Sequence, residues 1–240
     1  MITLYEGVPG SGKSLYAAGQ ILEQLSLGHL VICNYPFNPP AGRKYRKGAL
    51  VVVNNDELTP DFCLRWSQIW LKFRRGGEPK EHQILLVVDE ASTVFNPRDW
   101  QRSDRKRWLS FFAQHRKLMF DVILIAQQDI QIDRQIRGCI DVADAFCDIR
   151  KFFPGRGWYL PPLFRRRSRV YLGKDTRASY LGTRIFCARR RWARAYDTFD
   201  LFGSDGVSKS SGPSCPVVPV PALVPCYRWK RPLDVSRAAG

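Results

Sequence analysis

The chain alternates between short runs of apolar residues and longer stretches in which apolar residues recur every three or four positions. Short apolar runs are typical of strands, and the longer spacing is typical of amphipathic helices. The runs ILLVV and VILIA contain no polar residue, as expected for parallel strands that are buried on both faces. The pattern predicts, in order, strand 2–6, helix 13–27, strand 30–34, strand 49–53, helix 60–75, strand 84–89, helix 103–118 and strand 121–126.

Strands that alternate with helices in this way predict an α/β fold, with a mostly parallel sheet flanked by helices on both faces. Further along the chain, residues 143–153 predict one more strand and residues 155–172 a hairpin or loop. We expect residues 1–202 to form one domain, with a basic, β-rich part at about 150–196. Residues 203–240 are rich in Pro, Ser and Gly, which predicts a flexible tail without a packed core.

A glycine-rich segment joins the first predicted strand to the first predicted helix. Its spacing is that of a P-loop, in which backbone N–H groups converge on phosphate oxygens, a lysine reaches the β- and γ-phosphates and a serine hydroxyl binds Mg²⁺. The position between a strand and a helix favours this interpretation over a glycine turn without a ligand. The predicted ATP-binding residues of this P-loop NTPase are Gly7, Val8, Pro9, Gly10, Ser11, Gly12, Lys13 and Ser14.

The segment ILLVVDEAS supplies the second part of a hydrolysis site, a Walker B pattern. Asp89 follows a buried strand and would hold Mg²⁺ together with Ser14, while Glu90 would act as the general base that polarises the attacking water. Both carboxylates are expected at the strand edge where ligands of open α/β sheets bind. In the alternative interpretation, Asp89 and Glu90 only cap the helix that follows.

The last predicted strand of the core ends in two glutamines, and either could sense the γ-phosphate. Gln127 directly follows the apolar run and is the preferred candidate over Gln128, although it could instead satisfy backbone groups of the loop. Phosphoryl transfer often recruits an arginine that stabilises charge in the transition state. The candidates are Arg116, Arg134 and Arg137; Arg116 could equally complement the dipole of the helix that it ends.

The charge of the chain calls for an anionic partner. The formal net charge is +16 and the isoelectric point is about 9.9, with basic residues concentrated between positions 150 and 194. Arginines that alternate with aromatic residues there favour a groove for single-stranded nucleic acid; an anionic membrane surface, an acidic partner and a solvated face are the alternatives. The predicted nucleic-acid-binding residues are Arg165, Arg166, Arg167, Arg189, Arg190 and Arg191.

Several other classes of protein find little support. The 7 cysteines are odd in number and have no CxxC spacing, and the 3 histidines are scattered, so neither a zinc site nor a disulfide framework is expected. Reduced cysteines favour the cytoplasm. The first residues lead directly into a strand, which predicts no signal peptide, and no apolar run reaches the roughly 18 residues of a transmembrane helix.

Taken together, several segments resemble the zonular occludens toxin family, which includes the gene I assembly proteins of filamentous bacteriophages. The resemblance covers about residues 1–200, and its most specific part is the combination of the QHRK segment with the glutamine-containing strand and the stretch that follows it. The segments that carry it are YEGVPGSGKS, VVDEAS, FFAQHRK, DVILIAQQDIQIDRQIR and YDTFD.

The resemblance implies a P-loop ATPase, distantly similar to the FtsK and HerA motors, that drives assembly and export of single-stranded DNA phage through the host envelope. It implies three kinds of partner: phage DNA or its protein complex, envelope assembly proteins, and further copies of the chain in a ring such as a hexamer. It places the protein in the host bacterial cytoplasm at the inner membrane, although this sequence predicts no transmembrane segment. A non-catalytic, nucleotide-gated interaction module and a secreted effector stay open as alternatives.

Overall fold

The computed structural model describes most of the first 196 residues of the chain. The described residues are 1–40, 45, 47–73, 80–98, 104–153, 161–171 and 179–196, together with the backbone of 217–218. The predicted flexible tail, apart from that short backbone segment, lies outside these residues, as do residues 197–202 at the end of the predicted domain.

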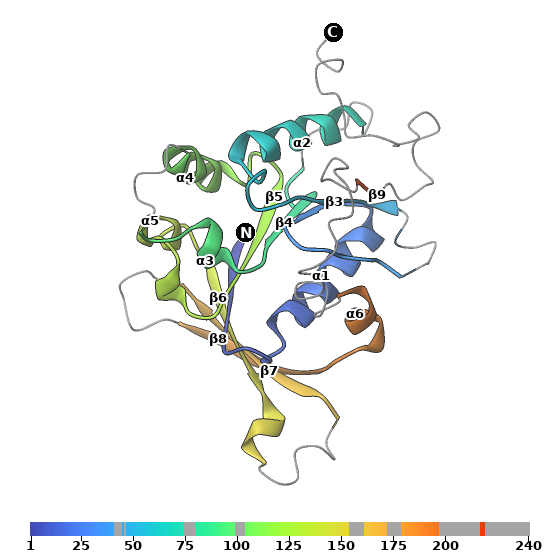
Figure 1. Ribbon diagram of the computed structural model, residues 1–240, viewed down its shortest axis with the longest axis vertical. Coiled ribbons are helices and arrows are strands. Elements are labelled where there is room, and N and C mark those ends of the chain that lie inside the picture. The colour runs from blue at the N-terminus through green and yellow to red at the C-terminus, as the bar shows by residue number, and fades with distance from the viewer. Residues whose placement is uncertain are drawn as a thin grey trace, which may run out of the picture.

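The described residues form a mixed α/β fold with one sheet (Figure 1). The strands are β1 (Ile2–Glu6), β2 (Leu30–Cys33), β3 (Ala49–Val52), β4 (Ile84–Val88), β5 (Phe120–Ala126), β6 (Val142–Asp148), β7 (Leu163–Val170), β8 (Tyr180–Cys187) and β9 (Val217–Val218). The helices are α1 (Lys13–Leu27), α2 (Pro60–Phe73), α3 (Ala91–Val94), α4 (Arg105–Gln114), α5 (Arg134–Arg137) and α6 (Arg190–Ala195), with short 3₁₀ helices η2 (Asp129–Gln131) and η3 (Ile149–Phe152).

The sheet has 9 strands in the order β8-β7-β6-β1-β5-β4-β2-β3-β9. The strands from β6 to β3 are parallel to their neighbours, and β7, β8 and β9 pair antiparallel at the two sides. Because β1, β5 and β4 are neighbours, the loops that follow them meet at the same edge of the sheet. The predicted fold class, an α/β P-loop core with a mostly parallel sheet, is confirmed.

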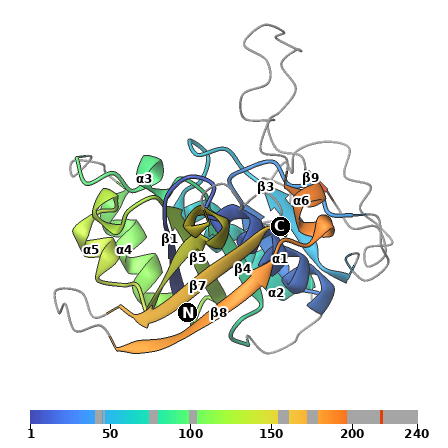
Figure 2. The same cartoon turned by 90° about the horizontal axis from the view of Figure 1, so that it is seen from below.

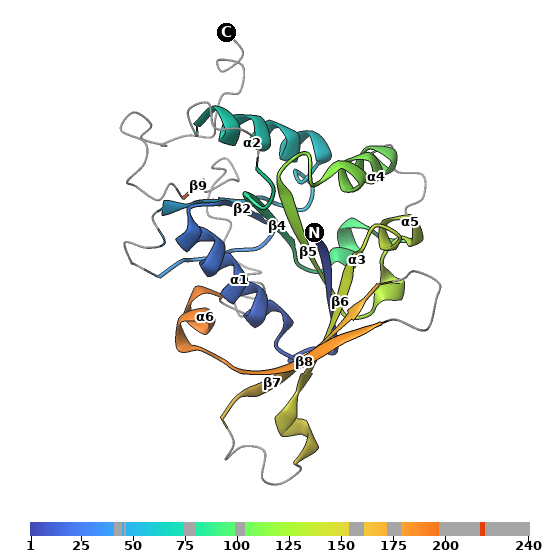
Figure 3. The ribbon, with the colours of Figure 1, turned by 180° about the vertical axis from the view of Figure 1, so that it is seen from behind.

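Helices cover both faces of this sheet (Figures 1 and 3), and each face has its own buried core. One core joins the sheet to α2, α3, α4 and α5, and includes the fully buried Trp108 and Phe112 of α4. The other joins the opposite face to α1 and α6, through residues such as Ile21 and Ala195. The apolar stripes of the predicted helices therefore face the sheet, as amphipathic helices do.

A hairpin of β7 and β8 extends the sheet beyond β6 (Figure 2). β6 ends at Asp148, where the chain turns into η3, so the strand predicted at 143–153 is shorter than expected. Residues predicted as hairpin or loop include β7, whose side chains alternate between the two faces of the sheet. The hairpin contributes most of the basic, β-rich part of the chain.

Helix boundaries differ from the predicted ones mainly at α4. The helix ends at Gln114, because residues 115–119 form turns that include Met119 at a φ of 68°. The helices α3, α5 and α6 were not expected from the sequence, since each is too short to establish a helical period. Among the described residues, no helix has both the length and the apolar character that crossing a membrane requires.

Candidate nucleotide-binding site

The predicted P-loop lies where β1 ends and α1 begins. All three of its glycines adopt backbone conformations that other residues rarely take, Gly7 with a φ of 146°, Gly10 with a φ of 73° and Gly12 with a φ of 93°. A Cβ atom on Gly7 would lie 2.6 Å from the carbonyl oxygen of Phe146 in β6, and one on Gly12 would lie 2.7 Å from the ring of Phe164 in β7. The loop is therefore folded closely against its neighbouring strands, which leaves room for glycine alone.

Lys13 opens α1 and bends back over the loop. Its Nζ atom donates to the carbonyl oxygens of Gly7 at 2.6 Å and Val8 at 3.2 Å. Burial lowers the pKa of the Lys13 ammonium group, and the carboxylates of Asp89 and Glu90 oppose this shift. The predicted phosphate-binding lysine thus lies over the loop and interacts electrostatically with Asp89, a predicted magnesium ligand, and Glu90, the predicted base.

Several donors around the loop suit an anionic ligand. The first amide groups of a helix have no acceptor within that helix, and α1 begins after Gly12, which provides no side-chain cap. The hydroxyl of Ser11 is buried and has no hydrogen-bond partner among the described residues. An anion with several oxygens, such as a phosphate chain, would satisfy these groups, so the residues present fit a nucleotide.

Ser14 and Asp89, the predicted magnesium ligands, lie next to each other. The Ser14 hydroxyl donates to Asp89 Oδ2 at 3.3 Å, although the residues are 75 positions apart. A hydroxyl and a carboxylate are oxygen ligands of the kind that Mg²⁺ prefers, together with phosphate oxygens. Among the described residues, His, Cys, Asp and Glu form no cluster that could hold a metal ion by themselves, so this pair depends on a nucleotide for further ligands.

Asp89 is held in place by three other residues. Asn34 at the end of β2 accepts from the Asp89 amide at 2.6 Å and donates to the Asp89 carbonyl at 2.8 Å. The Glu90 amide donates to Asp89 Oδ1 at 2.9 Å, and the Tyr196 hydroxyl donates to Oδ2 at 3.4 Å. Burial raises the pKa of Asp89, while the hydrogen bonds from Glu90, Ser14 and Tyr196 and the charge of Lys13 act against it.

Asn34 and Tyr196 belong to this site although neither was predicted as a site residue from the sequence. Asn34 carried a usable signal, since it ends a predicted strand at the same edge of the sheet as Asp89. Tyr196 begins the YDTFD segment of the resemblance, but nothing in the sequence pointed to a contact with Asp89, which lies 107 residues earlier. Its approach depends on how α6 packs against α1.

Glu90 and Gln127 are the other predicted catalytic residues in this part of the molecule. Glu90 is exposed, has a left-handed backbone with a φ of 47°, and makes no side-chain cap to α3, which does not support a capping role for its carboxylate. The carbonyl oxygen of Gln127 accepts from the Gly7 amide at 3.2 Å, and its exposed side chain follows β5 beside the loop. Gln128, the alternative, makes a capping box with η2.

The three candidate arginines lie at different parts of the sheet, and Arg137 is beside Asp129, two residues after Gln127. Arg116 is 3.9 Å from Asp141, whose carboxylate accepts from the Ile2 amide at the start of β1, so Arg116 lies at the opposite edge of the sheet from the P-loop. It therefore cannot complete the site of its own chain. Arg137 lies 3.9 Å from Asp129, and Arg134 opens α5, which packs beside α4.

Comparison with known proteins places this site in a family. Residues 1–149, more than half of the chain and the part with the P-loop, Asp89, Glu90 and Gln127, match the zonular occludens toxin (Zot) family. The chain belongs to the Zot family. The predicted resemblance is thereby confirmed.

Relatives of this Zot-family chain include gene 1 proteins of filamentous phages. It is 30% identical to the gene 1 protein of Enterobacteria phage I2-2 in an alignment of 233 positions that covers 89% of this chain and 60% of that protein. It is 26% identical to the gene 1 protein of Enterobacteria phage fd over 147 residues, 59% of this chain and 40% of that protein. The chain thus spans about half the length of these relatives.

The fold of this Zot-family chain also resembles a solved structure, that of the N-terminal domain of zonular occludens toxin from Neisseria meningitidis. The TM-score is 0.52 at 16% identity, and the similarity covers 82% of this chain and 98% of that domain. At this level of identity, the comparison supports the fold.

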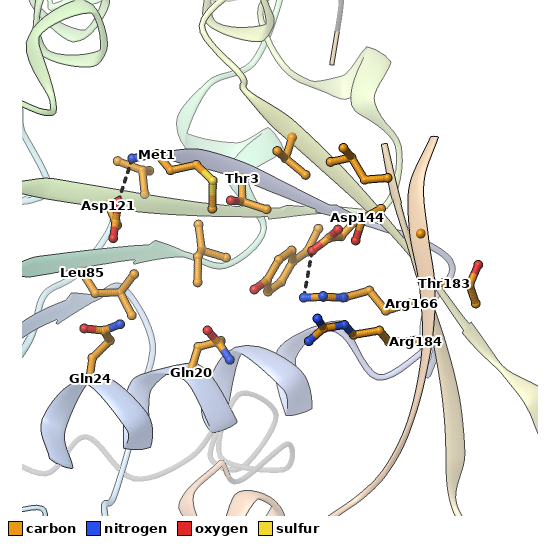
Figure 4. Close-up of a pocket in the computed structure, with 17 residues that line it drawn as sticks. Met1, Thr3, Gln20, Gln24, Leu85, Asp121, Asp144, Arg166, Thr183 and Arg184 are labelled. Carbon is orange, nitrogen blue, oxygen red and sulfur yellow. Dashed lines mark hydrogen bonds and ion pairs between the residues drawn. The ribbon is translucent and has the colours of Figure 1, made fainter. Parts of the chain in front are cut away.

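The basic residues of the Zot-family chain do not form one surface. Arg166 of β7 is only 18% exposed, lies 3.4 Å from Asp144 and donates to the Tyr16 hydroxyl at 2.8 Å (Figure 4). It is therefore not available as a surface cation, which corrects its prediction as a nucleic-acid contact. Arg165 and Arg167 alternate to the other face of β7 and are exposed, with their guanidinium groups 5.6 Å and 5.0 Å from the ring centroids of Phe152 and Tyr180.

The remaining predicted nucleic-acid contacts belong to α6 and the residue before it. Arg189 lies 5.4 Å from the ring centroid of Trp192, and Arg190 and Arg191 are exposed. Because α6 packs on α1 and the outer face of β7 lies on the other side of the sheet, these arginines and the pair on β7 form two separate basic surfaces.

Proposed function

We propose that this chain binds ATP with Mg²⁺ and hydrolyses it at the site between β1, β4 and β5. The observation that carries the proposal is the contact of Ser14 with Asp89, which joins the P-loop to the carboxylate at the end of β4. The closeness of Lys13 to Asp89 and Glu90 supports it. Adenine nucleotide is inferred from the P-loop pattern and from membership of the Zot family.

In this proposal each residue has a distinct role. The loop amides and Lys13 bind the phosphates, and Ser14 and Asp89 hold Mg²⁺, which neutralises phosphate charge when it is bound. Glu90 accepts a proton from the attacking water. The Gln127 side chain contacts the γ-phosphate region, from a backbone position fixed by its hydrogen bond to the loop.

The wider role that we propose is a motor that assembles filamentous phage and exports it through the host envelope. The similarity to gene 1 proteins and the net charge of +16 support this role. Its partners would be phage single-stranded DNA or the protein complex of that DNA, and envelope proteins at the cytoplasmic face of the inner membrane. Arg116, Arg134 or Arg137 would act on the site of a neighbouring copy in a ring such as a hexamer.

ATP turnover by the purified full chain tests the proposal. Lys13→Ala should reduce turnover by at least about 100-fold, the scale on which losing one preorganised group that stabilises transition-state charge acts. Lys117→Ala, which removes an exposed lysine at the opposite edge of the sheet, is the matched control and should leave turnover unchanged. Equal turnover in wild type and Lys13→Ala would show that another site, or a contaminant, hydrolyses the ATP.

Glu90→Gln separates hydrolysis from nucleotide-gated binding. It removes the proposed base but keeps the size of the side chain, so it should abolish turnover while binding of a fluorescent ATP analogue remains. If the wild type binds the analogue without measurable turnover, and Glu90→Gln changes nothing, the chain is a nucleotide-gated interaction module and hydrolysis is wrong.

A further inference from the structure

After β8 the chain returns to the nucleotide site through α6, an element outside the P-loop and Walker B motifs. α6 lies along α1, and Tyr196 directly follows it. The Tyr196 hydroxyl donates to Asp89 Oδ2 at 3.4 Å, and Oδ2 is also the acceptor for Ser14. Tyr196 lies well outside residues 1–149, which match the Zot family, and the roles proposed above do not use it.

Packing fixes the position of Tyr196 from two sides. Its ring meets the buried Tyr35 edge-on, with centroids 5.3 Å apart, and the Ala195 carbonyl accepts from the Asn38 amide at 3.0 Å. α6 is anchored by Trp192, which packs against Gly19 in α1. The hydroxyl is thus brought to Asp89 by a folded element and does not reach it by chance from a mobile side chain.

The chemistry of the two side chains decides which of them donates the hydrogen bond. A phenol keeps its proton at neutral pH and a carboxylate offers only acceptor atoms, so the Tyr196 hydroxyl is the donor and Asp89 Oδ2 the acceptor. Because Tyr196 and Ser14 both donate to Oδ2 and the Glu90 amide donates to Oδ1, the orientation of the Asp89 carboxylate is fixed by these donors. At 3.4 Å the hydrogen bond is long, and such bonds tighten when ligand fills a catalytic site.

We propose that Tyr196 is a positioning residue that sets the Asp89 carboxylate for Mg²⁺ and thereby couples α6 to occupancy of the nucleotide site. This inference rests on the proposed function. Changing a residue that orients a metal ligand typically costs about 10- to 100-fold in metal affinity or activity. Tightening of the bond would also hold α6 against α1 when magnesium and nucleotide are bound.

The test compares Tyr196→Phe with Tyr35→Phe in the full chain. Both changes remove one phenol oxygen, but the Tyr35 hydroxyl has no hydrogen-bond partner among the described residues, which makes it a matched control. Tyr196→Phe should raise the Mg²⁺ concentration for half-maximal turnover about tenfold, with kcat changed less than about twofold. Tyr35→Phe should match the wild type in both quantities.

A second measurement is independent of turnover. Trypsin cleaves after the arginines of α6, so its cleavage rate there reports how firmly α6 is held. Without nucleotide, Tyr196→Phe should be cut faster than Tyr35→Phe; magnesium with the non-hydrolysable analogue AMPPNP should protect α6 in Tyr35→Phe and in the wild type but not in Tyr196→Phe.

The outcomes separate the two proposals. If the wild type does not turn over ATP, the proposed hydrolysis fails, and the nucleotide-free cleavage rates still decide whether Tyr196 holds α6. If the wild type is active and the Mg²⁺ dependence of Tyr196→Phe is unchanged or tighter, the positioning role is wrong. Equal cleavage rates of the two variants would overturn the coupling to α6.

Discussion

At the scale of single residues, His115 has a structural role, although it belongs to a segment that points to the function of the family. His115 belongs to the QHRK segment on which the family resemblance partly rests, yet it is buried in the fold. Its Nδ1–H donates to the Phe112 carbonyl at 2.7 Å and closes the end of α4. Its Nε2 atom is buried without a hydrogen-bond partner among the described residues. We infer that His115 ends the helix and positions the turn before β5.

The burial of His115 predicts a pH dependence of stability. Burial lowers the pKa of His115 below its ordinary value near 6.5, so between these two pKa values the unfolded chain binds the proton more strongly than the folded one. Stability is therefore fully present above about pH 7 and falls as the pH drops through 6.5. His115→Gln removes this group, and the difference in Tm between wild type and variant should narrow by about 2–4 °C between pH 7.5 and pH 5.5.

Thermal unfolding followed by circular dichroism at several pH values measures this difference. The comparison uses the two proteins at each pH, so that all other titrating groups cancel. A gap in Tm that is constant with pH, or that widens toward acid, would show that His115 is protonated as readily in the folded chain as in the unfolded one.

At the scale of elements, the most specific packing joins α6 to α1. Gly19 lies in the middle of α1, where alanine ordinarily stabilises a helix by up to about 1 kcal/mol. A Cβ atom there would lie only 2.7 Å from Cε2 of Trp192, within the indole ring. Glycine at position 19 therefore lowers the helix propensity of α1, but it allows α6 to approach α1 closely.

A double-mutant cycle tests this packing. Gly19→Ala should lower the free energy of unfolding by about 1–2 kcal/mol, because the indole must shift. In the Trp192→Ala background, the same Gly19→Ala change should be neutral or stabilising by up to about 1 kcal/mol, since the helix then gains alanine without the clash. Denaturant unfolding of the four proteins gives the coupling energy; additive effects would place Trp192 away from Gly19.

The sequence predicted the parallel core because its strands are apolar throughout and its helices are long enough to show a period. It also predicted that Ser14, Asp89, Glu90 and Gln127 share one edge of the sheet, because each follows a strand of that core or belongs to the P-loop. It did not predict α6 or Tyr196. Six helical residues have no recognisable period, and a contact across 107 residues leaves no local pattern.

At the scale of the whole molecule, the arginines that the sequence predicted to form one nucleic-acid-binding region are divided among different surfaces. On β7, Arg165 and Arg167 face solvent beside exposed aromatic residues, while Arg166 turns inward to Asp144. Strand alternation therefore divides three consecutive arginines between a surface and a buried ion pair. Of the arginines on β7, we expect the outward-facing pair to provide the contacts to single-stranded DNA.

Binding of fluorescent single-stranded DNA tests this expectation. Arg165→Ala with Arg167→Ala should weaken binding and reduce the slope of log K against log salt by about 1.4, because two phosphate contacts are lost. The control is Arg65→Ala with Lys72→Ala, which removes the same charge from the exposed face of α2. If both double variants bind equally well, the hairpin is not the DNA-binding surface; if both lose the same affinity, only the net charge matters.

The packing of β7 and α6 against the P-loop and α1 also determines where the chain can be truncated for expression. A fragment that stops at residue 149, where the family match ends, would keep every P-loop motif and look complete. It would nevertheless leave the Asp144 carboxylate without Arg166, and would remove Phe164 from Gly12 of the P-loop and Trp192 from Gly19 of α1. The shortest fragment worth expressing to test for ATP turnover therefore extends through Tyr196.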